Sequence, residues 1–280
     1  MPGTLYIVAT PLGNLGDLST RAAEVLRTVP VVAAEDTRRT RGLLTHLGAT
    51  PRLLSYHAHS ENRRLDKLLE ILGEGRDVAL VSDAGTPAVS DPGTELVAAA
   101  RAAGVTVVPI PGPSAVATAL SAAGLKGGDR YLFLGFIPRK GSERARLLAR
   151  AAGEEWSVVL FEAPPRLVDL LEELARAAGG TRRAVVAREL TKVHEELRLG
   201  TLDELAGYYT EHPPRGELTV VLEGAGTPAE PPDRTEDAVA QATRLLAEGL
   251  TRREVVRRLS ESQSLGLSRN DAYRLVMELP

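Results

Sequence analysis

The sequence predicts an α/β protein with two α/β lobes and a small helical domain at its end. Short apolar runs, typical of buried strands, alternate with helical patterns as far as Leu222. A stretch rich in Gly, Ala and Pro then runs from Gly224 to Pro232, and only helical patterns lie beyond it. The 280 residues give room for this organisation, because domains commonly have roughly 100–200 residues.

The first lobe is expected over residues 1–113, as a parallel sheet with helices on both faces. Its strand candidates are nearly continuous apolar runs, as expected where both sides of a strand are buried. These runs are Leu5–Ala9, Val29–Ala34, Val78–Val81 and Val105–Ile110. Helical spacing of apolar residues between the strands predicts helices at Ser19–Thr28, Arg63–Leu72 and Glu95–Ala103.

A second lobe of the same kind is expected over residues 114–224. Its strand candidates are Tyr131–Gly135, Ser157–Glu162, Arg183–Ala187 and Leu218–Leu222. Helical patterns between them cover Arg144–Ala152 and Arg166–Ala178. Nothing repeats at a fixed period, so the sequence excludes a solenoid.

The last part of the chain is expected to be a linker over residues 225–234 and a helical domain over residues 235–280. The predicted helices are Thr235–Ala247, Thr251–Ser260 and Ser268–Glu278. Thr251 and Ser268 stand where N-cap residues belong. The last two helices, with Gly266 between them, have the pattern of a helix–turn–helix unit.

Composition excludes several classes of function. Without cysteine there is no disulfide, no thiolate metal site and no cysteine nucleophile. The net charge of −3 argues against nucleic-acid binding through bulk charge. No apolar stretch reaches about 18 residues, and the N-terminus lacks the pattern of a signal peptide. We therefore expect a cytoplasmic protein without a membrane partner.

Polar or Gly/Pro-rich loops follow the strand candidates of the first lobe. Because ligands of open parallel sheets bind outside the carboxyl ends of the strands, four such loops in succession indicate a site. Ordinary strand–helix turn chemistry would explain any one of them alone. The loops are Thr10–Asn14, Glu35–Arg38, Ser82–Gly93 and Pro111–Ala115.

Several familiar motifs are absent. The sequence contains no dinucleotide-binding G-x-G-x-x-G after the first strand, no phosphate loop and no H-E-x-x-H. The pair His57 and His59 lacks a carboxylate cluster, so an exposed polar loop explains it better than a metal site, and no metal is expected. Asp83 and Asp91 could act as general bases or cap their loop, and their spacing alone favours capping.

Taken together, the loops resemble the tetrapyrrole methylase superfamily of S-adenosylmethionine enzymes. Within it they are similar to the bacterial small-subunit ribosomal RNA (cytidine-2′-O)-methyltransferases. The resemblance covers the whole chain in order, and the 82–93 run is its most specific part. The matching segments are Val8–Leu15, Ala34–Arg38, Ser82–Gly93, Pro111–Ser114, Phe133–Pro138, Ala187–Lys192, Gly216–Glu217 and Glu223–Gly224.

The chain departs from the family pattern at one loop. Where the family carries Phe-Tyr-Glu-Ser/Ala-Pro-His-Arg, Leu160–Arg166 reads Leu-Phe-Glu-Ala-Pro-Pro-Arg. No tyrosine hydroxyl or histidine is available there, so we expect this loop to form a wall of the cofactor site and not to act as a catalyst.

The resemblance implies two lobes with the active-site cleft between them and S-adenosylmethionine bound in that cleft, largely by backbone groups. By motif position, the implied cofactor contacts are Pro11, Ala84, Gly85, Thr86, Val89, Ser114, Ala115, Glu162, Leu190 and Leu218.

The implied reaction is attack of a cytidine ribose 2′-hydroxyl on the sulfonium methyl, in the decoding centre of 16S rRNA. This hydroxyl is a poor nucleophile, so the enzyme must align it and remove its proton. Candidates for the base or orienting group are Asp36, Asp83, Glu189 and Lys192. The alternatives are purely structural: an ion pair of Asp36 with Arg38 or Arg39, a turn cap by Asp83, and an ion pair of Glu189 with Arg188 or Lys192.

The expected partner is 16S rRNA, contacted by basic side chains at two places, and the family implies a homodimer. Taken alone, the arginines of the helical domain fit a solvated face, but the resemblance favours RNA binding. The expected RNA contacts are Arg139, Lys140 and Arg144 in the second lobe and Arg252, Arg253, Arg257 and Arg269 in the helical domain.

Two other functions stay open. One is C-methylation of a tetrapyrrole precursor, which the basic helices and the Ala84–Pro87 loop disfavour, because those enzymes usually carry Gly-Asp-Pro there. The other is a regulator in which an α/β ligand sensor controls a DNA-binding helix–turn–helix.

Overall fold

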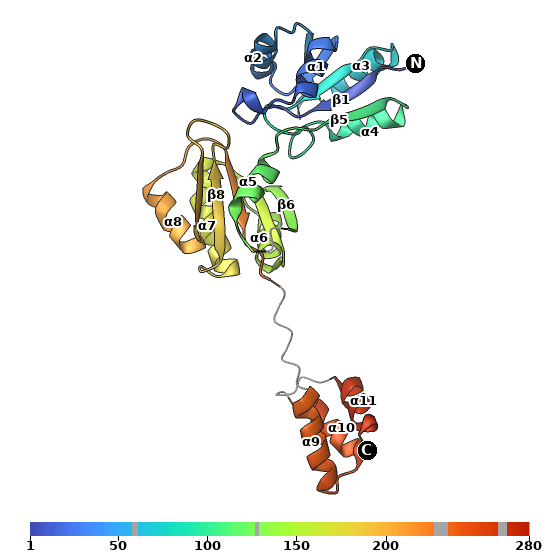
Figure 1. The fold of residues 1–280 in the computed structure, drawn as a ribbon, viewed down its shortest axis with the longest axis vertical. Helices are drawn as coiled ribbons and strands as arrows, with labels where there is room; N and C mark the ends of the chain where they lie inside the picture. The colour runs from blue at the N-terminus through green and yellow to red at the C-terminus, as the bar shows by residue number, and fades with distance from the viewer. Residues whose placement is uncertain (58–60, 127–128, 227–234, 263–267, 280) are drawn as a thin grey trace. The chain divides into compact units, whose positions relative to one another are not determined.

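The computed structural model describes residues 1–57, 61–126, 129–226, 235–262 and 268–279 (Figure 1). The chain divides into two compact units, Met1–Gly226 and Thr227–Pro280. Residues 227–234 of the predicted linker, together with His59 and Gly266, lie outside the described residues. In the described part of the chain, no helix has the length and apolar character needed to cross a membrane.

The first lobe contains the predicted parallel sheet, with strand order β3-β2-β4-β1-β5. The strands are β1 (Thr4–Val8), β2 (Val31–Ala34), β3 (Arg52–Ser55), β4 (Val78–Val81) and β5 (Thr106–Ile110). The helices are η1 (Leu15–Asp17), α1 (Thr20–Thr28), α2 (Thr37–Leu47), α3 (Glu61–Gly73) and α4 (Thr94–Ala102).

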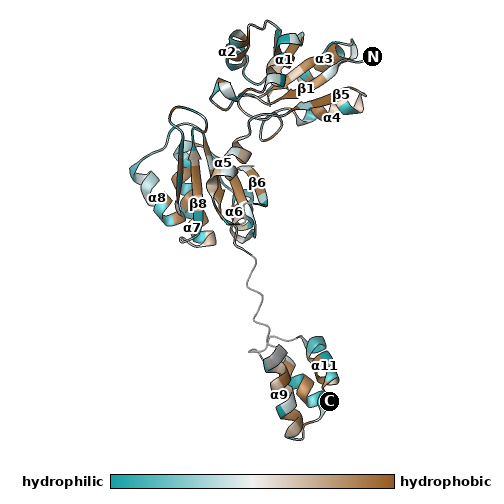
Figure 2. Ribbon diagram, viewed as in Figure 1, coloured by the Kyte–Doolittle hydropathy of each residue, from teal (hydrophilic) through white to brown (hydrophobic). Residues whose placement is uncertain are grey.

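Helices cover both faces of this sheet, and alternate side chains of a strand pack against the helices on opposite faces. Val78 and Leu80 of β4 belong to the core formed with α3 and α4. Ala79 and Val81 belong to the core formed with α1 and α2. Figure 2 shows the hydrophobic strands against helices whose outer faces are hydrophilic.

The second lobe has strand order β6-β7-β10-β8-β9, and here the predicted parallel sheet is wrong. Only β6 and β7 pair in parallel, while β10 and β9 run antiparallel to their neighbours. The strands are β6 (Tyr131–Phe136), β7 (Ser157–Glu162), β8 (Arg183–Arg188), β9 (Glu196–Thr201) and β10 (Leu218–Leu222). The helices are α5 (Ala115–Ala123), α6 (Ser142–Gly153), η2 (Pro164–Arg166), α7 (Leu167–Ala178) and α8 (Leu202–Glu211).

The physical reason is the short loop between β8 and β9. A loop of this length returns the chain antiparallel, whereas a parallel connection needs a crossover of a dozen residues or more. Strand β9 carries charged residues on a partly exposed sheet edge and gives no apolar run, so the sequence pattern missed it.

In its described residues, 235–262 and 268–279, the second unit contains the three predicted helices: α9 (Thr235–Ala247), α10 (Arg252–Glu261) and α11 (Arg269–Glu278). The predicted N-caps are confirmed, because the hydroxyls of Thr251 and Ser268 accept hydrogen bonds from Glu254 N–H and Asp271 N–H. A small core from all three helices holds the unit together; it includes Ala242, Leu245, Val255, Leu259 and Val276.

Candidate functional site

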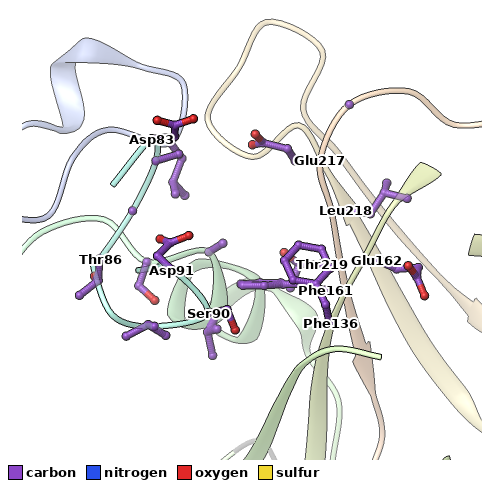
Figure 3. A pocket seen from close by; sticks show the side chains of 18 of the residues that line it. Asp83, Thr86, Ser90, Asp91, Phe136, Phe161, Glu162, Glu217, Leu218 and Thr219 are labelled. Carbon is purple, nitrogen blue, oxygen red and sulfur yellow. The ribbon is translucent and has the colours of Figure 1, made fainter. Parts of the chain in front are cut away.

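A cavity of about 480 Å³ lies at the carboxyl ends of the first lobe's strands, where they face the second lobe (Figure 3). The first lobe contributes the loop after β4, and the start of α5 adds Ser114 and Ala115. The second lobe contributes the end of β6, the end of β7 and the entry to β10. This is the position at which open parallel sheets bind ligands.

Backbone hydrogen bonds join the loops of the first lobe into one rim. Thr10 N–H donates to the carbonyl of Gly85 at 2.8 Å, and Gly85 N–H donates back at 3.0 Å. The hydroxyl of Thr86 donates to the carbonyl of Pro113 at 3.1 Å. Three of the four predicted loops are therefore fixed relative to one another.

The loop after β4 is held in an unusual backbone conformation. Ala88 and Ser90 have φ of 66° and 63°, in the left-handed region that disfavours side chains. Gly93 ends the loop at φ 138°, and a Cβ there would lie 2.6 Å from the Leu80 side chain. Strain of this kind persists only where the surrounding structure imposes it, and it is common at functional sites.

Four carboxylates, from Glu35, Asp83, Asp91 and Glu217, line the first-lobe side and the entry to β10. Burial raises the pKa of Glu35, and the charge of Asp83 adds to the rise. Burial, followed by the charge of Glu35, raises the pKa of Asp91 to about 7, against a hydrogen bond from Ser82. The cavity therefore holds carboxyl groups that resist ionisation.

Asp36 and Asp83 form hydrogen bonds and ion pairs at the start of α2. Asp83 accepts the N–H of Asp36 at 2.9 Å and lies 3.7 Å from Arg39. Asp36 caps α2 and pairs with Arg38 at 2.8 Å, which holds its pKa at about 2. Asp83 lines the cavity, whereas Asp36 does not.

Aromatic side chains form the opposite wall. The ring of Phe161 packs against Phe133 with centroids 5.0 Å apart and against Phe136 at 5.4 Å. Phe136 is 58% exposed although it is a large apolar residue, and Figure 3 shows its ring with that of Phe161 across the cavity from Asp91.

Glu162, next to this wall, is buried. Its Oε1 accepts the N–H of Ala163 at 2.8 Å, and its Oε2 lies 3.1 Å from Arg166. Burial raises the pKa of Glu162. Arg166 also donates to the carbonyl of Ile137, so the loop that departs from the family pattern is anchored to the chain beyond β6.

Glu189 and Lys192 form a bridge beside the cavity and do not line it. Lys192 Nζ lies 2.8 Å from Glu189 and 3.2 Å from Glu217. Partial burial tends to raise the pKa of Glu189 and to lower that of Lys192. The hydrogen bond between them outweighs burial, so the pKa of Glu189 is lowered and that of Lys192 is raised. A Cβ on Gly13 would lie 2.1 Å from Lys192 Cγ, so this side chain of the second lobe packs on the first.

The structure brings most of the predicted cofactor residues together. Those that line the cavity are Ala84, Gly85, Thr86, Val89, Ser114, Ala115, Glu162 and Leu218. Pro11 and Leu190 are not part of the lining, and Leu190 is packed in the core below α5. Sequence reasoning did not single out Glu35, Phe136 or Glu217 individually, although each lies in a segment that carries the resemblance.

The predicted RNA-binding residues differ in accessibility. Arg139 and Lys140 are exposed beside α6, as are Arg253, Arg257 and Arg269 in the second unit. Arg252 is exposed too and donates to the carbonyl of Leu279 at 3.1 Å. Arg144 is buried; it pairs with Glu173 at 2.7 Å and donates to the carbonyl of Pro138 at 3.0 Å, which favours a structural role.

Within the described residues, no group of three or more His, Asp or Glu side chains is placed to hold a metal ion. Of the predicted polar loop with two histidines, only His57 can be described.

Comparison with known proteins defines the class. Residues 4–206 match the family model of the Tetrapyrrole (Corrin/Porphyrin) Methylases. The crystal structure of uroporphyrin-III-C-methyltransferase from Thermus thermophilus covers 78% of this chain and 94% of its own, with 26% identity and a TM-score of 0.58. The chain therefore belongs to the tetrapyrrole methylase family, and it is an S-adenosylmethionine-dependent methyltransferase.

Two relatives narrow the comparison. "Ribosomal RNA small subunit methyltransferase I" of a Synechocystis species is 47% identical over 99% of this chain and 98% of its own length. The protein of that name from Escherichia coli O157:H7 is 44% identical over 88% of this chain and 84% of its own length.

Proposed function

We propose that the protein transfers a methyl group to the ribose 2′-hydroxyl of a cytidine in the decoding centre of 16S rRNA. The observation that carries the proposal is the cavity between the two lobes, formed by the segments that resemble this enzyme group. The Synechocystis relative named for small-subunit ribosomal RNA matches over 99% of the chain at 47% identity, whereas the uroporphyrin methyltransferase covers 78% at 26% identity.

The residues of the cavity fit S-adenosylmethionine. Gly85 lines the cavity with φ of 83° and no side chain, so a ligand can approach its backbone closely. Phe136 and Phe161 offer apolar faces to a planar adenine, and the carboxylates suit a cationic sulfonium and an amino group. When bound, the cofactor supplies an electrophilic methyl group attached to sulfur.

We propose that the cofactor contacts the eight predicted residues that line the cavity. Pro11 and Leu190 do not line it and are proposed to hold those residues in place. Among the four proposed catalytic groups, Asp83 alone reaches the cavity. The other three are proposed to position neighbouring groups. Asp36 caps α2, and Glu189 and Lys192 bind Glu217 at the edge of the cavity.

RNA is proposed to contact exposed basic side chains in both units. Arg139 and Lys140 lie three and four residues beyond the cavity-lining Phe136, so a nucleotide in the cavity would bring phosphates near them. The exposed arginines of α10 and α11 add phosphate contacts that carry no sequence information.

The proposal includes the cytoplasm as the place of action, because the substrate is a small ribosomal subunit, and a homodimer as the assembly. Light scattering coupled to gel filtration tests the second point: a monomer mass at micromolar concentration would contradict it.

The central experiment incubates the protein with methyl-labelled S-adenosylmethionine and small ribosomal subunits from a strain lacking the modification. We expect label in one cytidine, with the neighbouring phosphodiester resistant to alkali as a 2′-O-methyl group requires. Label on the base, or labelling of a uroporphyrinogen-type tetrapyrrole in place of RNA, would contradict the proposal. Sequence-specific binding of duplex DNA would favour a regulator.

A further inference from the structure

The proposed reaction needs a group that takes the proton of the ribose hydroxyl, and the acids first expected to do so have other partners. Asp36 is paired with Arg38, and Glu189 with Lys192, both outside the cavity lining. Asp83 lines the cavity, but one of its oxygens accepts the N–H of Asp36 and the other faces Arg39.

Asp91 is placed differently. It lines the cavity on the loop after β4, on the side opposite the rings of Phe136 and Phe161 (Figure 3). Among the described residues it forms no salt bridge, unlike Asp36 and Asp83. Its neighbours in the loop have a constrained backbone: Ser90 has φ of 63°, and the space beside Gly93 leaves no room for a Cβ next to Leu80.

We propose that Asp91 is the catalytic base, which contacts the ribose 2′-hydroxyl and accepts its proton during methyl transfer. The inference rests on the proposed function and adds the residue that serves it. It depends on the position of Asp91 in the cavity wall and on its lack of an ion-pair partner among the described residues.

The groups facing Asp91 suit a base that works near neutral pH. These acidic groups are Asp83 on the same loop, Glu35 after β2 and Glu217 before β10, and the charge of each raises the pKa of Asp91. The nearby cations are engaged elsewhere: Arg39 faces Asp83, and Lys192 holds Glu189 and Glu217. Together with burial, these charges explain why the pKa of Asp91 rises to about 7, where proton transfer is efficient.

The step balances with the groups named. The ribose oxygen forms a bond to the methyl carbon while the carbon–sulfur bond breaks, and its electron pair remains on sulfur as a neutral thioether. The hydroxyl proton passes to the carboxylate of Asp91, which then releases it to water. The positive charge of the sulfonium is thus exchanged for one released proton, and no other reactant is needed.

The test compares the wild type with Asp91→Asn, Asp91→Glu and, as a control, Glu95→Gln, which removes an exposed acid four residues further along. Turnover is measured on unmodified small subunits over a range of pH, and binding of S-adenosylhomocysteine is measured by calorimetry. We expect Asp91→Asn to lower kcat by ~100-fold or more, as is typical for loss of a general base. Cofactor affinity should stay within ~2-fold, and Glu95→Gln should match the wild type.

The pH profile separates catalysis from a structural role. In the wild type, kcat should fall on the acidic side of pH 7, because a protonated Asp91 cannot accept a proton. The positive charge of the donor shifts this limb below the value for the free protein. The residual activity of Asp91→Asn should not show this fall in kcat at acidic pH. Asp91→Glu should recover part of the rate and should still show the fall.

Two results would overturn the inference: turnover of Asp91→Asn within a few-fold of the wild type, or loss of S-adenosylhomocysteine binding in that variant, which would assign Asp91 to the cofactor. The proposed function fails by a different result, namely wild-type protein that labels no ribose oxygen. In that case the same comparison, made on the position that the wild type does label, still decides whether Asp91 takes the proton.

Discussion

At the scale of single residues, the raised pKa of Asp91 has a consequence for the stability of the folded protein. The pKa of Asp91 is about 7 in the folded protein, above the ordinary carboxyl value of 3.8. A carboxyl group whose pKa is raised by folding destabilises the folded state once the pH exceeds its unfolded value, and this cost is complete above the folded value. Ionised Asp91 therefore opposes folding at neutral and alkaline pH.

We accordingly predict that Asp91→Asn unfolds at a higher temperature than the wild type, and more so at pH 8 than at pH 5. Because the side chain is partly exposed, we expect the difference between the two pH values to be on the order of 1 kcal/mol in the free energy of unfolding. Thermal denaturation followed by circular dichroism measures it. Equal stabilisation at both pH values, or a less stable variant at pH 8, would disprove this prediction, and Glu95→Gln is the control.

Lys192 supplies the second residue-scale prediction. Lys192→Met keeps the apolar stem against Gly13 but removes the charge that holds Glu189 and Glu217. We expect turnover to fall by about 10–100-fold, because a small displacement of groups in an active site costs a factor of this size. Glu189→Gln should behave similarly.

In both variants, cofactor binding measured by calorimetry should be unchanged, since neither residue lines the cavity. The control is Lys126→Met, an exposed lysine. Wild-type turnover in Lys192→Met would show that Lys192 has no role in positioning the active site.

The sequence predicted which loops form the cavity better than it predicted the roles of the acidic residues within those loops. Glycine and proline at strand ends mark where backbone approaches a ligand, and eight of the ten proposed cofactor residues line one cavity. Whether a given acid faces the cavity or an arginine depends on distances between loops far apart in sequence, such as that from Asp36 to Asp83. Local patterns carry no information on those distances, so Asp36 and Asp91 could not be told apart.

At the scale of elements, the strands that are apolar on both sides were predictable, because burial on both faces leaves an unbroken apolar run. Every predicted strand and helix is present with its ends within two residues of the observed ones. The missed strands and α-helices are those with mixed exposure or little periodicity, namely α2, β3, α5, α8 and β9, and the short 3-10 helices η1 and η2 were not predicted either. The strand direction in the second sheet was missed together with β9, since an edge strand returning through a short loop reverses the connection.

The capping box at α10 gives a prediction at this scale. The Thr251 hydroxyl accepts the N–H of Glu254, and the Glu254 side chain accepts the N–H of Thr251. Thr251→Ala should destabilise the second unit by about 1 kcal/mol, the usual cost of losing such a cap.

Hydrogen exchange of amides in α10 would report this loss. The matched control is Thr243→Ala on the exposed face of α9, where the hydroxyl bonds only to the carbonyl of Val239 in the same helix. Unchanged protection in Thr251→Ala would show that the core residues alone maintain the helix.

At the scale of the whole molecule, the division at Gly226 separates the proposed chemistry from part of the proposed RNA binding. A chain that ends at Gly226 keeps both lobes and every residue of the cavity lining. It should bind S-adenosylhomocysteine with wild-type affinity and methylate small subunits with a KM raised at least ~10-fold, because phosphate contacts supply much of the affinity for RNA.

The full-length variant with Arg253, Arg257 and Arg269 replaced by Gln should show a smaller rise in KM. Its binding should also depend more weakly on salt, by about one unit of slope for each phosphate that an arginine no longer neutralises. A truncated chain with wild-type KM would exclude the second unit from RNA recognition. The net charge of −3 does not reveal this local excess of positive charge, because residues 250–274 carry six arginines against three acidic residues.

The two lobes meet at positions that only glycine allows. A Cβ on Gly13 would lie 2.1 Å from Lys192 Cγ, and one on Gly135 would lie 2.7 Å from the hydroxyl of Ser90. Each glycine belongs to one lobe and each opposing side chain to the other. A methyl group at either point would act as a spacer between the lobes, so the two glycines help to set the width of the gap in which we propose that the methyl donor and its acceptor meet.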